Sequence, residues 1–173
     1  ELNGGFIKNY GVTLVIDNSI SCLNPLTAEH TMQTIRIFLS SMSSSDLPCF
    51  DLIITGEKNP IVVCSEMSTS TALDDKSDIW GTIYSLLLPP KMKTDLASAI
   101  NAALEINNLR RIDCTNLIFV ITDGLFSQLD QKIIKEKIMI CENKDINVYG
   151  IGVGISPRGI ENLFNQVIFS QNP

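Results

Sequence analysis

Six short runs of consecutive apolar residues recur along the chain, and longer segments with apolar residues three or four positions apart lie between most of them. Short unbroken runs are typical of buried strands, and the longer period is typical of amphipathic helices. The alternation predicts an α/β fold around a mainly parallel sheet. The expected strands are residues 12–16, 52–55, 61–64, 117–122, 148–153 and 167–169.

Apolar stripes at helical spacing predict the helices. They comprise Met32, Ile35, Leu39 and Met42, then Leu96, Ile100 and Ala103, and then Ile134, Ile138 and Cys141. Pro157 and Gly159 open a short last helix. Only residues 56–60 separate the second and third strands, which is too short for a crossover helix, so we expect an antiparallel hairpin there. The serine cluster at 40–45 indicates a fraying helix end and a loop, and residues 65–93 carry no clear period.

Carboxylates and hydroxyls follow two of the expected strands. Asp17, Ser19 and Ser21 leave the first strand at alternate positions, Asp123 follows the fourth strand, and Thr94 begins the helix between them. In an open parallel sheet, ligands bind outside the carboxyl ends of the strands, where strand order reverses. If the chain winds outward in opposite directions from these two strands, all five side chains converge on one crevice. Such an oxygen-only set suits Mg²⁺, or Mn²⁺, better than Ca²⁺.

These residues resemble the von Willebrand factor A domain and its metal ion-dependent adhesion site. The resemblance runs from Val12-Thr13-Leu14-Val15-Ile16-Asp17-Asn18-Ser19-Ile20-Ser21, through Thr94-Asp95-Leu96-Ala97-Ser98-Ala99-Ile100, to Phe119-Val120-Ile121-Thr122-Asp123-Gly124. It implies a doubly wound, Rossmann-like sheet of six strands in the order 3-2-1-4-5-6, with strand 3 antiparallel and helices on both faces. It also implies that Asp17, Ser19, Ser21, Thr94 and Asp123 coordinate Mg²⁺ directly or through water.

The expected function is a protein–protein interaction module without enzymatic activity, in which the metal binds a Glu or Asp side chain of a partner. The backbone amides near Asn18, Ile20 and Gly124 are then placed to orient the partner's main chain. Many family members have Gly where this chain has Lys93, whose cation either holds an anionic partner or points to solvent. The partner-binding rim is therefore predicted at Asn18, Ile20, Lys93 and Gly124.

Two other functions remain open. The first is a Mg²⁺-dependent phosphoryl-transfer or hydrolytic enzyme with Asp17 as its nucleophile, although no second acid lies two positions after Asp17. The second is a structural domain with a vestigial metal site. His30 is the only histidine and no Gly-x-Ser-x-Gly motif is present, which argues against a Ser/His/Asp triad.

Composition and net charge narrow the classes of partner that the chain is expected to bind. The 173 residues suit a single domain over residues 1–173, which we expect to be a piece of a longer protein because it begins at Glu1. With 13 Lys+Arg against 19 Asp+Glu, the formal charge is −6. An acidic surface repels nucleic-acid phosphates and anionic lipid, and no apolar run approaches a membrane span, so neither is an expected partner.

The cysteines, the single tryptophan and a cluster of aspartates give three further predictions. The five cysteines stand singly among apolar neighbours, which predicts reduced core residues and an intracellular location, cytoplasmic or nuclear. Trp80 is expected as a core anchor rather than a partner contact. Asp74, Asp75 and Asp78 form either a solvated loop or a second cation site.

Overall fold

The computed structural model describes residues 9–19, 25–44, 47, 49–74, 77–88, 95–109, 114–153 and 158–169. The predicted strands are all present in these residues. They are β1 Asn9–Ile16, β2 Cys49–Ile54, β3 Ile61–Ser68, β4 Cys114–Thr122, β5 Asn147–Gly152 and β6 Gln166–Phe169. Most begin earlier than their apolar runs, because backbone ladders such as Asn9 with Cys114 extend the pairing into polar sequence.

The sheet has the predicted order β3-β2-β1-β4-β5-β6. β1 lies at its centre and pairs in parallel with β2 and β4, while β3 runs antiparallel to β2 at one edge. The chain therefore winds from β1 to one edge and then from β4 to the other. This reversal places the ends of β1 and β4 side by side, with Ile16 opposite Ile121.

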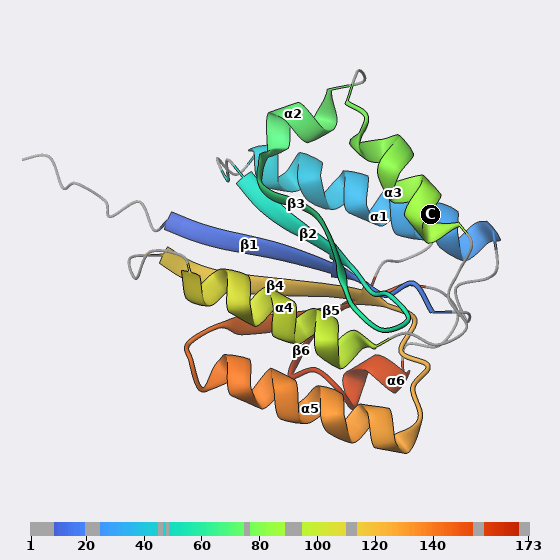
Figure 1. Ribbon diagram of the computed structural model, residues 1–173, viewed down its shortest axis with the longest axis vertical. Coiled ribbons are helices and arrows are strands. Elements are labelled where there is room, and N and C mark those ends of the chain that lie inside the picture. Colours follow the sequence, from blue (N-terminus) through green and yellow to red (C-terminus); the bar gives the residue numbers. More distant parts are fainter. Residues whose placement is uncertain are drawn as a thin grey trace, which may run out of the picture.

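Helices cover both faces of the sheet, as Figure 1 shows. The helices α1 Pro25–Ser44, α2 Thr69–Leu73 and α3 Ile79–Leu87 lie on one face, and α4 Leu96–Leu109, α5 Gln128–Glu142 and α6 Arg158–Glu161 lie on the other. Alternate residues of β1 divide between the two cores, since Leu14 packs with α1 and Val15 packs with α4. The fold class predicted from the sequence is confirmed.

Helices α2 and α3 were not predicted. α3 buries Ile79, Ile83 and Leu87, a stripe at helical spacing. Trp80 anchors this region as expected, since its indole N–H donates to the Ala72 carbonyl at 2.8 Å and the Arg36 guanidinium lies 4.8 Å from its ring. The single tryptophan thus joins α1, α2 and α3.

Two predictions need correction. The serines at 40–44 lie within α1 rather than in a loop, and the Ser41 and Ser44 hydroxyls donate to carbonyls one turn back, at Ile37 and Ser40. The strands of the second half are also not all buried. β4 and β5 bury their carboxyl-terminal halves, but the edge strand β6 leaves Ile168 47% and Phe169 40% exposed.

The described cysteines, Cys49, Cys64, Cys114 and Cys141, are all free thiols, as predicted. Only Cys141 is fully buried, and the other three are half-buried rather than core residues. Cys22 lies outside the described residues. Within the part of the chain that the structure describes, the helices are too short or too polar to cross a bilayer.

Candidate metal site at the ends of β1 and β4

Asp17 and Asp123 are the first residues after β1 and β4, and both are buried, with exposed fractions of 2% and 5%. The parallel pairing continues one step beyond the strand, because the backbone N–H of Asp17 donates to the Ile121 carbonyl at 2.9 Å. A buried carboxylate is costly unless polar partners replace its hydration.

The Thr122 hydroxyl links the two strand ends. It donates to Oδ2 of Asp17 at 2.8 Å and accepts from the backbone N–H of Gly124 at 3.1 Å. The other carboxylate oxygen of Asp17 accepts from the backbone N–H of Ser19 at 3.1 Å. Sequence reasoning did not single out Thr122, although it stands directly before Asp123. Its hydroxyl fixes the Asp17 carboxylate against the loop that carries Asp123.

The loop after β4 depends on a close backbone contact. Oδ1 of Asp123 accepts from the backbone N–H of Leu125 at 3.1 Å. Gly124 has φ of 76°, in the left-handed region that favours glycine, and a Cβ on it would lie 2.6 Å from Ile160 Cγ1 of α6. Gly159 meets Gly124 from the other side, where a Cβ would collide with the Gly124 carbonyl oxygen. The two glycines therefore let α6 support the Asp123 loop.

Asn18 holds the loop after β1, and its role differs from the prediction. Its backbone N–H donates to Oγ1 of Thr55 at 2.8 Å, and its side-chain amide donates to the Leu86 carbonyl at 2.8 Å. The residue is 1% exposed. The backbone N–H of Gly124 is likewise bound to Thr122. Two of the three amides expected to orient a partner's main chain thus have internal acceptors, and Asn18 and Gly124 hold the loops in place.

The structure describes only part of the predicted ligand set. Ser19 is half-buried beside Asp17. Ser21 and Thr94, and the rim residues Ile20 and Lys93, lie outside the described residues. Asp95, which follows Thr94, is exposed and accepts from the backbone N–H and hydroxyl of Ser98 at 2.9 and 2.6 Å. Asp95 therefore caps α4.

The donor chemistry fits a hard divalent cation. Two buried carboxylates at adjacent strand ends, with serine and threonine hydroxyls, make an oxygen-only set whose two negative charges match the charge of Mg²⁺. The hydrogen bonds described above reach these carboxylates from neutral amide and hydroxyl donors. Among the described residues, no three His, Cys, Asp or Glu side chains gather as a metal-binding group, but the predicted set contains only two. Asp74 and Asp78 are exposed and Asp75 lies outside the described residues.

Comparison with known proteins identifies solved structures of similar fold. No protein-family model and no curated protein sequence matches the chain. Among solved structures, manganese-loaded TRAP protein of Plasmodium vivax is similar to it with a TM-score of 0.72 and 15% identity, over 94% of this chain and 68% of that one. The SpRpn10 VWA domain gives a TM-score of 0.62 and 14% identity, over 93% and 87%.

Proximal thread matrix protein 1 of the mussel byssus is also similar, with a TM-score of 0.65 and 13% identity over 95% of this chain. The chain spans only 43% of that protein's length. Another crystal of the byssus protein has a zinc-occupied MIDAS motif. At these identities the similarity concerns the fold, which is of the von Willebrand factor A type. Two of these neighbours have been solved with a divalent metal, manganese in the TRAP protein and zinc in the byssus protein.

Proposed function

We propose that this chain is a protein-interaction module that binds an acidic side chain of a partner through a divalent cation. The observation that carries the proposal is the pair of buried carboxylates, Asp17 and Asp123. They lie where the order of strand addition reverses, and the Thr122 hydroxyl binds Asp17 there. A bound cation offsets the negative charge of two buried carboxylates, and the strand ends at such a reversal are where open sheets bind ligands.

The proposed ligands are Asp17, Ser19, Ser21, Thr94 and Asp123, with Mg²⁺ as the expected ion and Mn²⁺ as a substitute. When bound, the cation supplies a coordination position for a Glu or Asp carboxylate from the partner. The rest of the site is built by the chain: Thr122 and Asn18 fix the two loops, and Ile20 and Lys93 stay as the predicted rim. An intracellular location, expected from the free cysteines, also stays a prediction.

Calorimetric titration of the chain with MgCl₂ and MnCl₂ tests metal binding. We expect one site, which is lost in Asp17→Asn and Asp123→Asn, because each substitution removes one of the two charges that balance the ion. Asp145→Asn is the matched control, since Asp145 is exposed before β5, at the opposite ends of the strands. Equal metal affinity in all four proteins would contradict the proposed ligands.

Partner binding is tested by titrating acidic peptides with Mg²⁺ and again with EDTA. Binding that persists unchanged in EDTA contradicts the metal bridge. A metal that raises the melting temperature while no acidic peptide binds would favour the vestigial site. Phosphatase activity that depends on both Mg²⁺ and Asp17 would favour the enzyme instead.

A further inference from the structure

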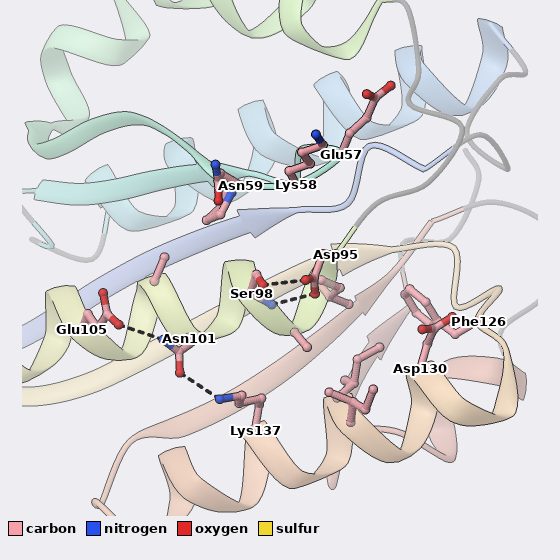
Figure 2. A pocket seen from close by; sticks show the side chains of 16 residues that line it. Glu57, Lys58, Asn59, Asp95, Ser98, Asn101, Glu105, Phe126, Asp130 and Lys137 are labelled. Carbon is pink, nitrogen blue, oxygen red and sulfur yellow. Dashed lines mark hydrogen bonds between the residues drawn. The ribbon is translucent and has the colours of Figure 1, made fainter.

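A groove of about 800 Å³ lies between the β2–β3 loop, α4 and the side of α5 that faces α4. Asp95 and Phe126 lie at its end nearest the strand ends, with Asp130 next to Phe126, and Lys137 lies farther along (Figure 2). Phe126 is three residues from Asp123, and Asp95 directly follows Thr94. This end of the groove therefore lies next to the loop that carries Asp123.

The groove carries an excess of negative charge. Four carboxylates line it, against the ammonium groups of Lys58 and Lys137. The donors that reach three of these carboxylates are neutral, namely Ser98 for Asp95, Ser127 for Asp130 and Asn101 for Glu105. Nζ of Lys137 donates to Oδ1 of Asn101 at 3.0 Å rather than to a carboxylate. A cationic side chain entering the groove thus meets carboxylates that are held in place but not neutralised.

One wall of the groove is apolar and partly uncovered. Phe126 is half-buried and Ile133 is 39% exposed, and both line the groove. Leu129, one helical turn before Ile133 on the same side of α5, is 68% exposed, and Leu125 is 60% exposed. Apolar side chains in a row beside a charged mouth are typical of a protein-interaction surface rather than of a nucleic-acid or lipid surface.

We propose that the groove binds a segment of a partner protein in which an apolar residue stands next to a lysine or arginine. The inference rests on the proposed function, because the same segment supplies the acid that the metal binds. The basic residue pairs with Asp95 and Asp130 at the mouth, and the apolar residue packs on Phe126 and Ile133. A partner that is acidic throughout is rejected by the groove even though the metal accepts its carboxylate.

The two acids also support helix starts, so charge has to be removed without breaking the caps. Asp95 accepts from Ser98 at the start of α4, and Asp130 exchanges hydrogen bonds with Ser127 at the start of α5. Asparagine caps helices about as well as aspartate, which covers Asp95, and at position 130 an amide oxygen can still accept from the Ser127 hydroxyl, the N-cap of α5. The double variant Asp95→Asn with Asp130→Asn therefore lowers the charge and keeps the fold. Asp78→Asn with Asp145→Asn removes two exposed charges elsewhere and is the control.

The apolar wall has its own matched pair. Ile133→Ser removes a side chain that lines the groove, and Ile140→Ser removes one of nearly equal exposure, 41%, on the same helix but outside the groove. Both residues are partly exposed, so both variants are expected to fold. Loss of the apolar contact predicts about 5- to 10-fold weaker binding for Ile133→Ser.

The probe is a phage-displayed library of random peptides, selected on the whole chain in Mg²⁺. The selected peptides are expected to contain an acid, a basic residue and an apolar neighbour. The acid-to-asparagine pair is expected to weaken their binding about 5-fold or more, and less so in high salt, whereas both controls stay within about 2-fold. Unchanged affinity in both groove variants, peptides without a basic residue, or no selected peptide would each overturn the groove proposal.

The design separates this inference from the metal bridge. Binding that is abolished by EDTA but unaffected by the groove variants leaves the proposed function and removes the inference. Groove-dependent binding that survives EDTA keeps the groove as a binding site and removes the metal bridge. Sedimentation of the free chain checks the remaining occupant, because self-association lost in Ile133→Ser would assign the groove to a second copy and overturn the proposal.

Discussion

Gly159, in the first turn of α6, touches the backbone of Gly124, the residue after Asp123. A Cβ on Gly159 would collide with the Gly124 carbonyl oxygen, and that oxygen belongs to a backbone that cannot swing aside as a flexible side chain would. The position of the Asp123 carboxylate is therefore tied to α6, an element that contributes no predicted ligand.

Gly159→Ala is expected to destabilise the fold by about 1–3 kcal/mol, because the added methyl group forces the Asp123 loop and α6 apart. It should also lower the affinity for Mg²⁺. Gly81→Ala is the control: a Cβ at this exposed position of α3 meets nothing within 4 Å, so a small gain in stability of about 0.5–1 kcal/mol is expected. Urea unfolding measures both, and equal effects of the two substitutions would refute the tie.

Thr122→Val removes the hydroxyl that joins Asp17 to the loop after β4, at nearly constant volume. The Asp17 carboxylate and the Gly124 N–H each lose a buried partner, and each loss costs about 1–3 kcal/mol. Thr122→Ser keeps the hydroxyl and should lose much less stability and little metal affinity. Denaturant unfolding and metal calorimetry on the two variants check this, and a valine variant at least as stable as the serine variant would show that the hydroxyl does not hold the two strand ends together.

Asp51 offers a third test, away from the site. This fully buried carboxylate of β2 accepts from the hydroxyls of Thr13 and Ser65, both at 3.0 Å, and from the backbone N–H of Glu66 at 2.9 Å. Glu66 has φ of 51°, where the β2–β3 register shifts.

Asp51→Asn replaces one acceptor oxygen with a donor, so we expect a loss of about 2–4 kcal/mol and faster amide hydrogen exchange along β3. Exposed Asp145→Asn should change neither. If exchange in β3 stays as slow as in the unsubstituted chain, the carboxylate does not hold the hairpin.

Thiol reactivity gives a fourth prediction. Burial raises the pKa of Cys64 from its ordinary 9.0 to about 11, against a backbone hydrogen bond with Leu52 that lowers it. Burial, with the nearby Glu142 carboxylate, also raises the pKa of Cys141 to about 11. At pH 8 only roughly one thiol in a thousand is then ionised, compared with roughly one in ten in the unfolded chain. Mass spectrometry after iodoacetamide treatment should show slow alkylation of both until urea unfolds the chain.

The same shifts fix the sign of a stability change at high pH. The unfolded chain ionises these thiols from about pH 9, and the folded chain from about pH 11. The unfolded state therefore binds fewer protons in this interval, and the free energy of unfolding falls as pH rises through it. Below about pH 8 these two thiols contribute almost no pH dependence. A melting temperature that rises from pH 9 to 11 would contradict the shifts.

The sequence predicted the sheet well because the strand signal is local and the topology follows from few rules. The five residues between the second and third predicted strands, 56–60, were enough to predict the antiparallel edge. The misses have physical reasons. Within 65–93, α2 and α3 are short and separated by polar residues, so their periods are too brief to recognise. Edge strand β6 looks like a core strand in sequence because Ile168 and Phe169 are apolar, and only the sheet order shows that β6 lies at the edge.

The sequence singles out the candidate acids of the site but not the residues that hold them in place. Asp17 and Asp123 stand out because each follows an apolar run. Thr122, Thr55 and Gly159 act through contacts with residues far away in the sequence, and no local pattern distinguishes them from ordinary turn residues. Asn18 is a further example, because nothing near it in the sequence indicates that its side-chain amide donates to the Leu86 carbonyl.

The hydrogen bond between Thr122 and Asp17 joins positions 105 residues apart. Closing so long a loop is slow, and a chain still being synthesised cannot close it before β4 has been made. Any ligand that needs both strand ends is therefore bound only after the sheet has been completed through its centre. A chain truncated before the end of β4 therefore lacks Asp123 and cannot form the proposed metal site.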